Sequence, residues 1–210
     1  YEDLQKDCLI PEKMNNFLKM PCFKPNIVLE GGSIDVNGDS ICLTTEQCLL
    51  HKNRNPILSK EEIETYIKNY LGVKEVIWLK MGIENDDTDG HIDDIARFVN
   101  ANTIVCASAE KYDKNYNPLA ENLEILENRK KSRNLNIVKL PMPRVKADDK
   151  MLPASYANFY IANNLLLVSV FGDKNDSKAL NVLEKLFPER KVIGINCKKL
   201  IYGFGALHCI

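Results

Sequence analysis

The sequence predicts an α/β protein built from three similar units, and two observations lead to this prediction. The order strand, hairpin turn, strand, helix, strand occurs three times, with first strands that begin near Ser33, His91 and Ser155. The period of roughly sixty residues is typical of stacked or radially arranged units. If the units surround an axis, equivalent ends of all three meet near the centre. Side chains far apart in the sequence then share one pocket.

The first unit carries turn and capping signals. Asn-Gly-Asp at 37–39 is a hairpin signal between two alternating segments. Ser59, followed three residues later by Glu62, is a capping box that starts a helix. The predicted segments are a leading helix over 6–20, a leading strand over 26–29, strands at 33–36, 40–45 and 75–79, and a helix over 60–70.

The second and third units repeat this order with different residues. Asn-containing turns at 100–102 and 162–164 separate their first two strands. Unit two is predicted to have strands at 91–99, 103–108 and 136–140 and a helix over 119–129. Unit three is predicted to have strands at 155–161, 165–171 and 191–195 and a helix over 177–186.

Composition limits the class of protein. With 45% hydrophobic and 27% charged residues, the 210 residues suffice to bury a sizeable core, so we expect a single domain over 1–210. The formal net charge of -1 argues against nucleic acid or an anionic membrane surface as a partner. The longest apolar stretch, 161–171, is too short to span a bilayer. Homo-oligomerisation is left open.

The cysteines indicate the cellular compartment of the protein and one candidate functional residue. Seven cysteines without a CxxC pair argue against a disulfide framework or a zinc site and favour a reducing, cytoplasmic location. Cys209 differs from the cysteines in apolar strands because it follows the glycine-rich segment 203–206. The backbone of such a segment can approach a ligand closely, so Gly205 is predicted to contact substrate.

Residues 86–94 contain six carboxylate or imidazole side chains. If this segment opens a strand, His91 and Asp93 are two residues apart and project from the same face. The imidazole can move protons near neutral pH, and the carboxylate can bind a cation. The alternative is a solvated acidic turn that leads into a strand.

A cysteine with a distant histidine is a candidate nucleophile and acid/base pair. For Cys209, the adjacent His208 is set aside because neighbours on an extended chain face opposite ways. His51 lies in a polar stretch, which leaves His91. Glu30, before two glycines, could orient His91 as acidic residues do in catalytic triads, or could be a salt-bridge or turn carboxylate.

The surplus of acidic residues around His91 indicates a cationic substrate. A guanidinium is planar and permanently charged, and it matches a carboxylate with two parallel hydrogen bonds. Its carbon is a poor electrophile, so carboxylates and a thiolate nucleophile are the groups it requires. The substrate cation and protonated His91 would favour the thiolate of Cys209.

Six segments closely resemble the agmatine deiminase family. They span most of the chain in the order of that family: EGGSI at 30–34, LTTEQCLL at 43–50, NRNP at 53–56, TDGHID at 88–93, SYANFYIAN at 155–163 and LHCI at 207–210. The family belongs to the pentein superfamily of guanidine-modifying enzymes, and the resemblance implies an α/β propeller with five strand-strand-helix-strand blades. The three units resemble three of these blades. Because an upstream Trp-x-Arg-Asp-Thr-Gly-Pro motif has no match in 1–29, we expect the chain to be the C-terminal portion of the propeller.

The resemblance implies hydrolysis of agmatine to N-carbamoylputrescine and ammonia, without metal or organic cofactor. Cys209 would attack the guanidinium carbon and form an amidino-cysteine intermediate. His91 would protonate the ammonia and then activate water, Asp93 would hold the guanidinium, and Glu30 would orient His91. Asp87 would receive the distal ammonium, with Asp86 and Asp89 as the other candidates for this role.

Two alternatives stay open. A bacterial peptidylarginine deiminase would share Cys209, His91 and Asp93 but would need an open cleft. A non-catalytic guanidine- or polyamine-binding module would use the acidic cluster only to hold a cation. Phe204, where many relatives continue a run of glycines, is expected to alter the approach of the backbone to the substrate.

Overall fold

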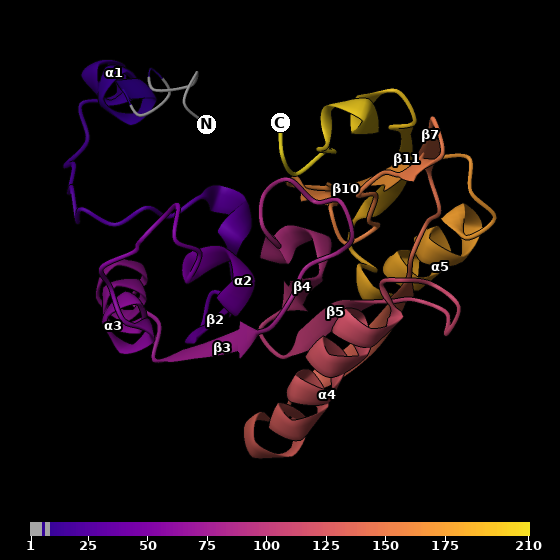
Figure 1. The fold of residues 1–210 in the computed structure, drawn as a ribbon, viewed down its shortest axis with the longest axis horizontal. Coiled ribbons are helices and arrows are strands. Elements are labelled where there is room, and N and C mark those ends of the chain that lie inside the picture. Colours follow the sequence, from indigo (N-terminus) through magenta and orange to yellow (C-terminus); the bar gives the residue numbers. More distant parts are fainter. Residues whose placement is uncertain (1–5, 7–8) are drawn as a thin grey trace.

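The computed structural model describes residue 6 and residues 9–210, and it contains three small three-stranded sheets in succession (Figure 1). In each sheet the first two strands are antiparallel and the third is parallel to the second. A helix connects the second strand to the third in every unit. The predicted threefold order of strand, strand, helix and strand is therefore confirmed.

The first unit follows the turn and capping signals closely. The Asn37 Oδ1 accepts three backbone N–H groups of the hairpin turn, and Ser59 and Glu62 form the predicted capping box. Thr45 caps a short helix that was not predicted. The elements are η2 (Gly31–Ser33), β1 (Ile34–Val36), β2 (Ile41–Thr45), α2 (Glu46–Leu49), α3 (Lys60–Leu71) and β3 (Glu75–Leu79).

The second and third units have shorter first strands than predicted. Unit two consists of η3 (Ile92–Asp94), β4 (Ala96–Asn100), β5 (Thr103–Ser108), α4 (Tyr116–Arg133) and β6 (Asn136–Pro141). Unit three consists of β9 (Tyr160–Ile161), β10 (Leu165–Val170), α5 (Asp176–Leu186), β11 (Lys191–Asn196) and η4 (Leu200–Gly203). An unpredicted hairpin of β7 (Lys146–Ala147) and β8 (Lys150–Met151) lies between them.

Local hydrogen bonds explain the two shortened strands. Residues 92–94 form a 3-10 turn, in which the Ile95 N–H donates to the Ile92 carbonyl over 2.9 Å, so the strand predicted from 91 begins only at β4. In unit three the Ala157 N–H donates to Ser155 Oγ over 3.1 Å. Such bonds compete with a strand ladder, so residues 155–159 are buried but irregular.

The segment before the first unit departs most from the prediction. The helix predicted over 6–20 is shorter, α1 (Ile10–Leu18), and residues 7 and 8 of that range lie outside the described residues. It buries none of its residues and lies apart from the three units (Figure 1). The strand predicted at 26–29 is wrong, because the N–H and carbonyl of Val28 bond to the side chain of Asn55 instead of to a neighbouring strand.

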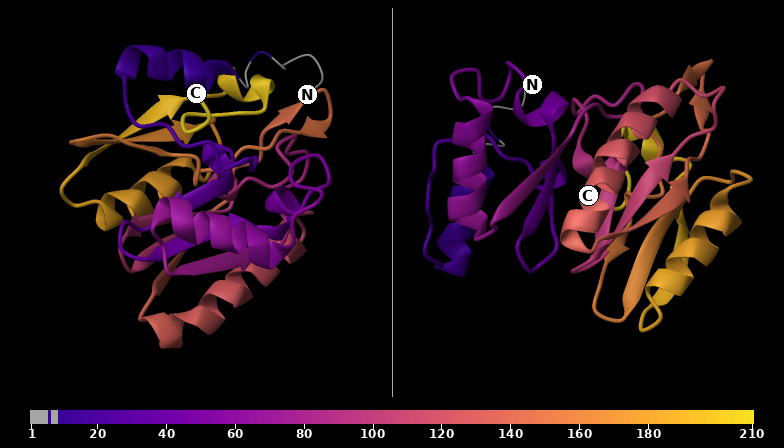
Figure 2. Two further views of the ribbon diagram at one scale, coloured as in Figure 1. Left: turned by 90° about the vertical axis from the view of Figure 1, so that its left-hand side faces the viewer. Right: turned by 90° about the horizontal axis from the view of Figure 1, so that it is seen from below.

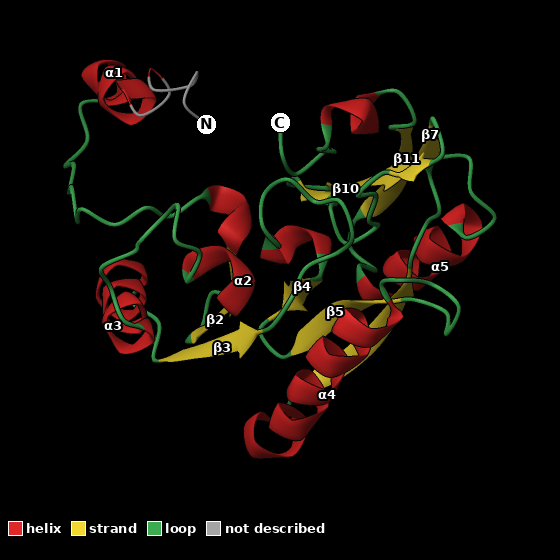
Figure 3. Cartoon of the chain, in the orientation of Figure 1, coloured by secondary structure: helices red, strands yellow, loops and turns green. Residues whose placement is uncertain are grey.

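The three long helices lie on the outer side of their sheets (Figures 2 and 3). The loop after β3 and the C-terminal segment line the same cavity. In the part of the chain that the structure describes, no helix has both the length and the apolar character needed to cross a membrane.

A buried ion pair links the first strands of units one and two, and its arginine also reaches the residue just before β9. The Arg97 Nε on β4 lies 2.8 Å from Asp35 Oδ1 on β1, and the Arg97 Nη1 donates to the Phe159 carbonyl over 3.1 Å. The Phe98 N–H donates to the second oxygen of Asp35. Burial raises the pKa of Asp35, although Arg97 and the Phe98 N–H oppose this effect. The carboxylate therefore depends on Arg97.

We expect Arg97→Met to lower the free energy of unfolding by about 3–5 kcal/mol at neutral pH, because it leaves a buried carboxylate without its counterion. The loss should shrink as the pH falls, since protonation of Asp35 removes the unpaired charge. Denaturant unfolding at two pH values measures both effects. The double variant Asp35→Leu/Arg97→Met should recover most of the loss, and an equally unstable double variant would contradict this account.

Candidate functional site

One cavity collects the predicted site residues from three separate parts of the chain. It has a volume of about 870 Å³ and opens between η2, the loop after β3 and the C-terminal segment. All six predicted site residues line it: Glu30, Asp87, His91, Asp93, Gly205 and Cys209. The cysteine and the histidine over a hundred positions earlier therefore face the same hollow.

Glu30 lies between His91 and a buried arginine. The His91 Nε2 is 3.4 Å from Glu30 Oε1, and the Arg54 guanidinium donates to both Glu30 oxygens over 2.8 to 3.0 Å. The Arg54 side chain is only 8% exposed. Burial of Glu30 opposes ionisation, but the nearby imidazole of His91 and the hydrogen bonds from Arg54 prevail and lower its pKa to about 2. Glu30 is therefore an anion that faces the imidazole. Sequence reasoning missed Arg54, although it lies in the quoted NRNP segment.

The carboxylates of the loop after β3 have different partners. Asp86 accepts from the N–H groups of Thr88 and Gly90 and so shapes the loop. Asp89 accepts from Arg54 Nη1 over 2.8 Å. Of the three candidates for the distal ammonium, only Asp87 lines the cavity.

His91 and Asp93 reach the cavity by a different route from the one predicted. The expectation that they share one face of a strand is wrong, because the chain turns through η3 directly after His91. The glycine at position 32 leaves room for both, since a Cβ built there would lie 2.5 Å from His91 Nδ1 and 2.9 Å from Asp93 Oδ2. Burial, together with Asp93 and Asp86, raises the pKa of the neighbouring Asp94 well above its ordinary range.

Asn158 connects the carboxylate to the cysteine, and sequence reasoning missed this role. Its side chain is fully buried, and its Nδ2 lies 3.1 Å from Cys209 Sγ and 3.3 Å from Asp93 Oδ2. Its Oδ1 accepts the His208 N–H over 2.9 Å. A buried amide in an otherwise apolar segment was the available signal, since such a group needs partners.

His208 also belongs to the cavity, although it was set aside as a partner of Cys209. Its Nδ1 lies 2.7 Å from Asp93 Oδ2. The chain is not extended here, because the Cys209 N–H donates to the Ala206 carbonyl and closes a turn. Both neighbours therefore reach the same cavity.

Negative charge surrounds the thiol of Cys209. Loss of solvation and the carboxylates of Asp93 and Asp94 raise its pKa to about 12, while the backbone of Ala206 and the side chain of Asn158 act in the opposite direction. Without a bound cation the group is therefore a thiol at neutral pH. A positive charge that arrives beside Asp93 would remove part of this penalty.

We expect alkylation of Cys209 in the free protein to be slow at neutral pH and to rise about tenfold per pH unit toward the thiol pKa of about 12, because only the thiolate reacts. Mass spectrometry of peptides after brief iodoacetamide treatment measures the rate, with the exposed Cys22 as an internal comparison. A rate that levels off near neutral pH would contradict this expectation.

A metal ion does not fit the donor atoms at this site. Among the described residues, Glu30, Cys48 and His91 form the one group of three whose donor atoms lie within 4.8 Å of one another. Arg54 already occupies both oxygens of Glu30. Burial raises the pKa of the Cys48 thiol to about 12, which disfavours the thiolate that a metal needs.

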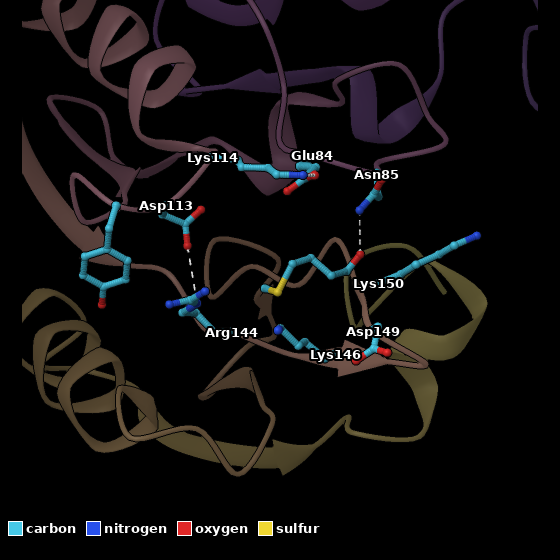
Figure 4. Close-up of a pocket in the computed structure, with 10 residues that line it drawn as sticks. Glu84, Asn85, Asp113, Lys114, Arg144, Lys146, Asp149 and Lys150 are labelled. Atoms are coloured by element: carbon cyan, nitrogen blue, oxygen red, sulfur yellow. Dashed lines mark hydrogen bonds and ion pairs between the residues drawn. The ribbon is translucent and has the colours of Figure 1, made fainter.

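A second hollow, shown in Figure 4, shares no lining residue with the cavity around Cys209. Its charged side chains largely pair with one another, as in Arg144 with Asp113 and Lys114 with Glu84. Asn85 bonds to the Met151 carbonyl of the β7–β8 hairpin. The bond from Asn85 joins the loop after β3 to the hairpin.

The fold and the cavity define an α/β protein with a cysteine, a histidine and several carboxylates around one hollow. The sequence pattern of the family described as Porphyromonas-type peptidyl-arginine deiminase matches residues 1–210. The chain belongs to this family.

Similar proteins and solved structures carry the agmatine deiminase name, so the resemblance to this family is confirmed. The agmatine deiminase of Medicago truncatula is 38% identical over all of this chain and 63% of its own length. A C. jejuni agmatine deiminase variant with substrate bound has a TM-score of 0.89 and 38% identity, over 95% of this chain and 60% of that one. The structure of an Enterococcus faecalis agmatine deiminase has a TM-score of 0.89 and 34% identity, over 95% of this chain and 61% of that one.

The chain spans about three fifths of the length of these relatives. DDAH from Pseudomonas aeruginosa, at 14% identity and a TM-score of 0.53, shares the fold alone.

Proposed function

We propose that the protein hydrolyses the guanidinium group of agmatine to N-carbamoylputrescine and ammonia, a step toward putrescine and other polyamines. The observation that carries this proposal is the single cavity shared by Cys209, His91 and Asp93. The named activity of the relatives supports the choice of agmatine.

The proposed reaction begins with a thiol that the substrate itself activates. The guanidinium binds beside Asp93, and its positive charge offsets the carboxylates that hold the pKa of Cys209 near 12. The sulfur forms a bond to the guanidinium carbon, and the proton of the thiol passes through His91 to the departing nitrogen, which leaves as ammonia. The remaining group is an amidino adduct on Cys209.

Hydrolysis then reverses the roles of the same groups. A water gives one proton to His91 and attacks the adduct carbon. The carbon–sulfur bond breaks as the added hydroxyl loses its remaining proton to the released ammonia or to solvent, and the proton on His91 returns to the thiolate. The Glu30 anion faces the Nε2 of His91 and so favours a proton on that nitrogen. The His91 Nδ1, which lies on the side of Gly32 and Asp93, is then the nitrogen that transfers protons.

The rest of the cavity suits an aliphatic chain that ends in a cation. Leu200, Phe204 and Ile210 line it and offer apolar contacts to the methylene groups. Phe204 has a φ of 60°, in the left-handed region, and is 41% exposed. Asp87 is the proposed partner of the distal ammonium, since it lines the cavity and Asp86 and Asp89 do not.

We further propose that the three units are three blades of a pentein-type propeller and that residues 1–210 form a single catalytic domain equivalent to its C-terminal portion. The mixed α/β units and the likeness to agmatine deiminase structures support this arrangement. We propose a cytoplasmic location from the cysteine pattern. Nucleic acid is not a proposed partner.

The rival function is deimination of arginine in proteins, which the family description favours. Ammonia release from agmatine, free arginine and a peptidyl-arginine distinguishes the two. We expect agmatine to give the highest kcat/KM, because the carboxylate of free arginine would face acidic residues and a peptide has no distal ammonium. Agmatine as the poorest of the three substrates would overturn the proposal, and mass spectrometry after brief incubation should find the adduct on Cys209.

A further inference from the structure

We propose that His208 is a positioning residue that holds Asp93 in place for the guanidinium; this inference deepens the proposed function and rests on it. The contact that supports it is short, with 2.7 Å between His208 Nδ1 and Asp93 Oδ2. The Asp93 side chain is 1% exposed, whereas His208 is 23% exposed and lines the cavity. The imidazole thus reaches from the cavity wall to a buried carboxylate.

The two oxygens of Asp93 have very different surroundings. Oδ2 accepts from His208 and lies 3.3 Å from Asn158 Nδ2 and 3.8 Å from Cys209 Sγ. Oδ1 is buried and has no hydrogen-bond partner among the described residues. A buried acceptor without a partner is costly, and such groups persist where a ligand uses them. His208 therefore fixes the carboxylate through one oxygen and leaves the other for the substrate.

His208 also ties the carboxylate to the segment that carries the nucleophile. Its backbone N–H donates to Asn158 Oδ1 over 2.9 Å, while its side chain bonds to Asp93 on η3. Cys209 is the next residue, so a movement of Asp93 relative to this segment changes the position of the guanidinium relative to the sulfur. Positioning of this kind affects both substrate binding and the chemical step.

Two amide variants test the contact at atomic level. In His208→Asn the Nδ2 occupies the place of the imidazole Nδ1, whereas in His208→Gln the amide nitrogen lies where Nε2 was. We expect His208→Asn to keep kcat/KM for agmatine within about threefold of the wild type, and His208→Gln and His208→Leu to lose at least about tenfold. The losses should appear mainly as a higher KM. Equal losses in the Asn and Gln variants would overturn the inference.

A binding measurement separates this inference from the proposed function. Calorimetry with agmatine on Cys209→Ser and on Cys209→Ser/His208→Leu requires no turnover, and the second variant should bind at least about tenfold more weakly. If wild type releases no ammonia but this difference is found, the proposed activity fails and the positioning role stands. Tighter binding without the imidazole would show that His208 occupies the guanidinium position in the free protein, and would overturn the inference. If the variants with His208→Leu do not fold, the comparison of His208→Asn with His208→Gln tests the inference.

Discussion

Cys209→Ser is expected to lower ammonia release from agmatine by about 10⁴-fold or more, and to leave the affinity for agmatine within about threefold. The serine hydroxyl is a far weaker nucleophile, and no described group near the sulfur can replace the thiolate. Binding should persist because Asp93, the proposed guanidinium ligand, is unchanged and because serine is close to cysteine in size. An ammonia-release assay and calorimetry measure the two quantities.

Cys22→Ser is the matched control, since Cys22 is exposed and does not line the cavity. It should keep full activity. If Cys209→Ser retained more than a few per cent of the wild-type rate, the nucleophile would lie elsewhere. If wild type and variant both bound agmatine and neither released ammonia, the protein would be a binding module instead of an enzyme.

The repeated units could be predicted from the sequence because their signals are local. The hairpin turn at 37–39 and the capping box of α3 depend on neighbouring residues, and the structure places both as predicted. The buried strands β5 and β10 read as apolar segments bounded by turns. Local signals of this kind need no knowledge of the remaining fold.

Within the three units, the errors lie where the chain lines the cavity or contacts the residues that line it. The first strands of units two and three were predicted too long, since 91–95 and 155–159 give up ladder hydrogen bonds for turns. His208 was set aside on the assumption of an extended chain, and the turn at Cys209 invalidates that assumption. Periodicity describes regular elements, so it fails where side chains converge on one volume from irregular backbone.

The repeated units predict that distant site residues meet in one cavity, but they do not predict which side chains bond to those residues. Units arranged about an axis bring equivalent ends together, and Glu30, His91 and Cys209 do line one cavity. The links from Arg54 to Glu30 and from Asn158 to Cys209 depend on contacts between residues 24 and 51 positions apart. No local pattern indicates such contacts.

Gly32→Ala should reduce kcat/KM for agmatine by about 100-fold or more, since a displacement of about 1 Å at reacting groups costs that much. A Cβ at this position would lie 2.5 Å from His91 Nδ1, 2.9 Å from Asp93 Oδ2 and 3.2 Å from Asp93 Cγ, so the imidazole or the carboxylate must move. Gly31→Ala is the matched control, because its Cβ would meet nothing within 4 Å, and it should keep activity within about threefold. Steady-state kinetics, with thermal unfolding to verify the fold of both variants, measure the difference. Equal activities of the Gly32→Ala and Gly31→Ala variants would contradict this prediction. They would mean that His91 can move away from the added methyl group without loss of activity, so that its position is not rigidly fixed.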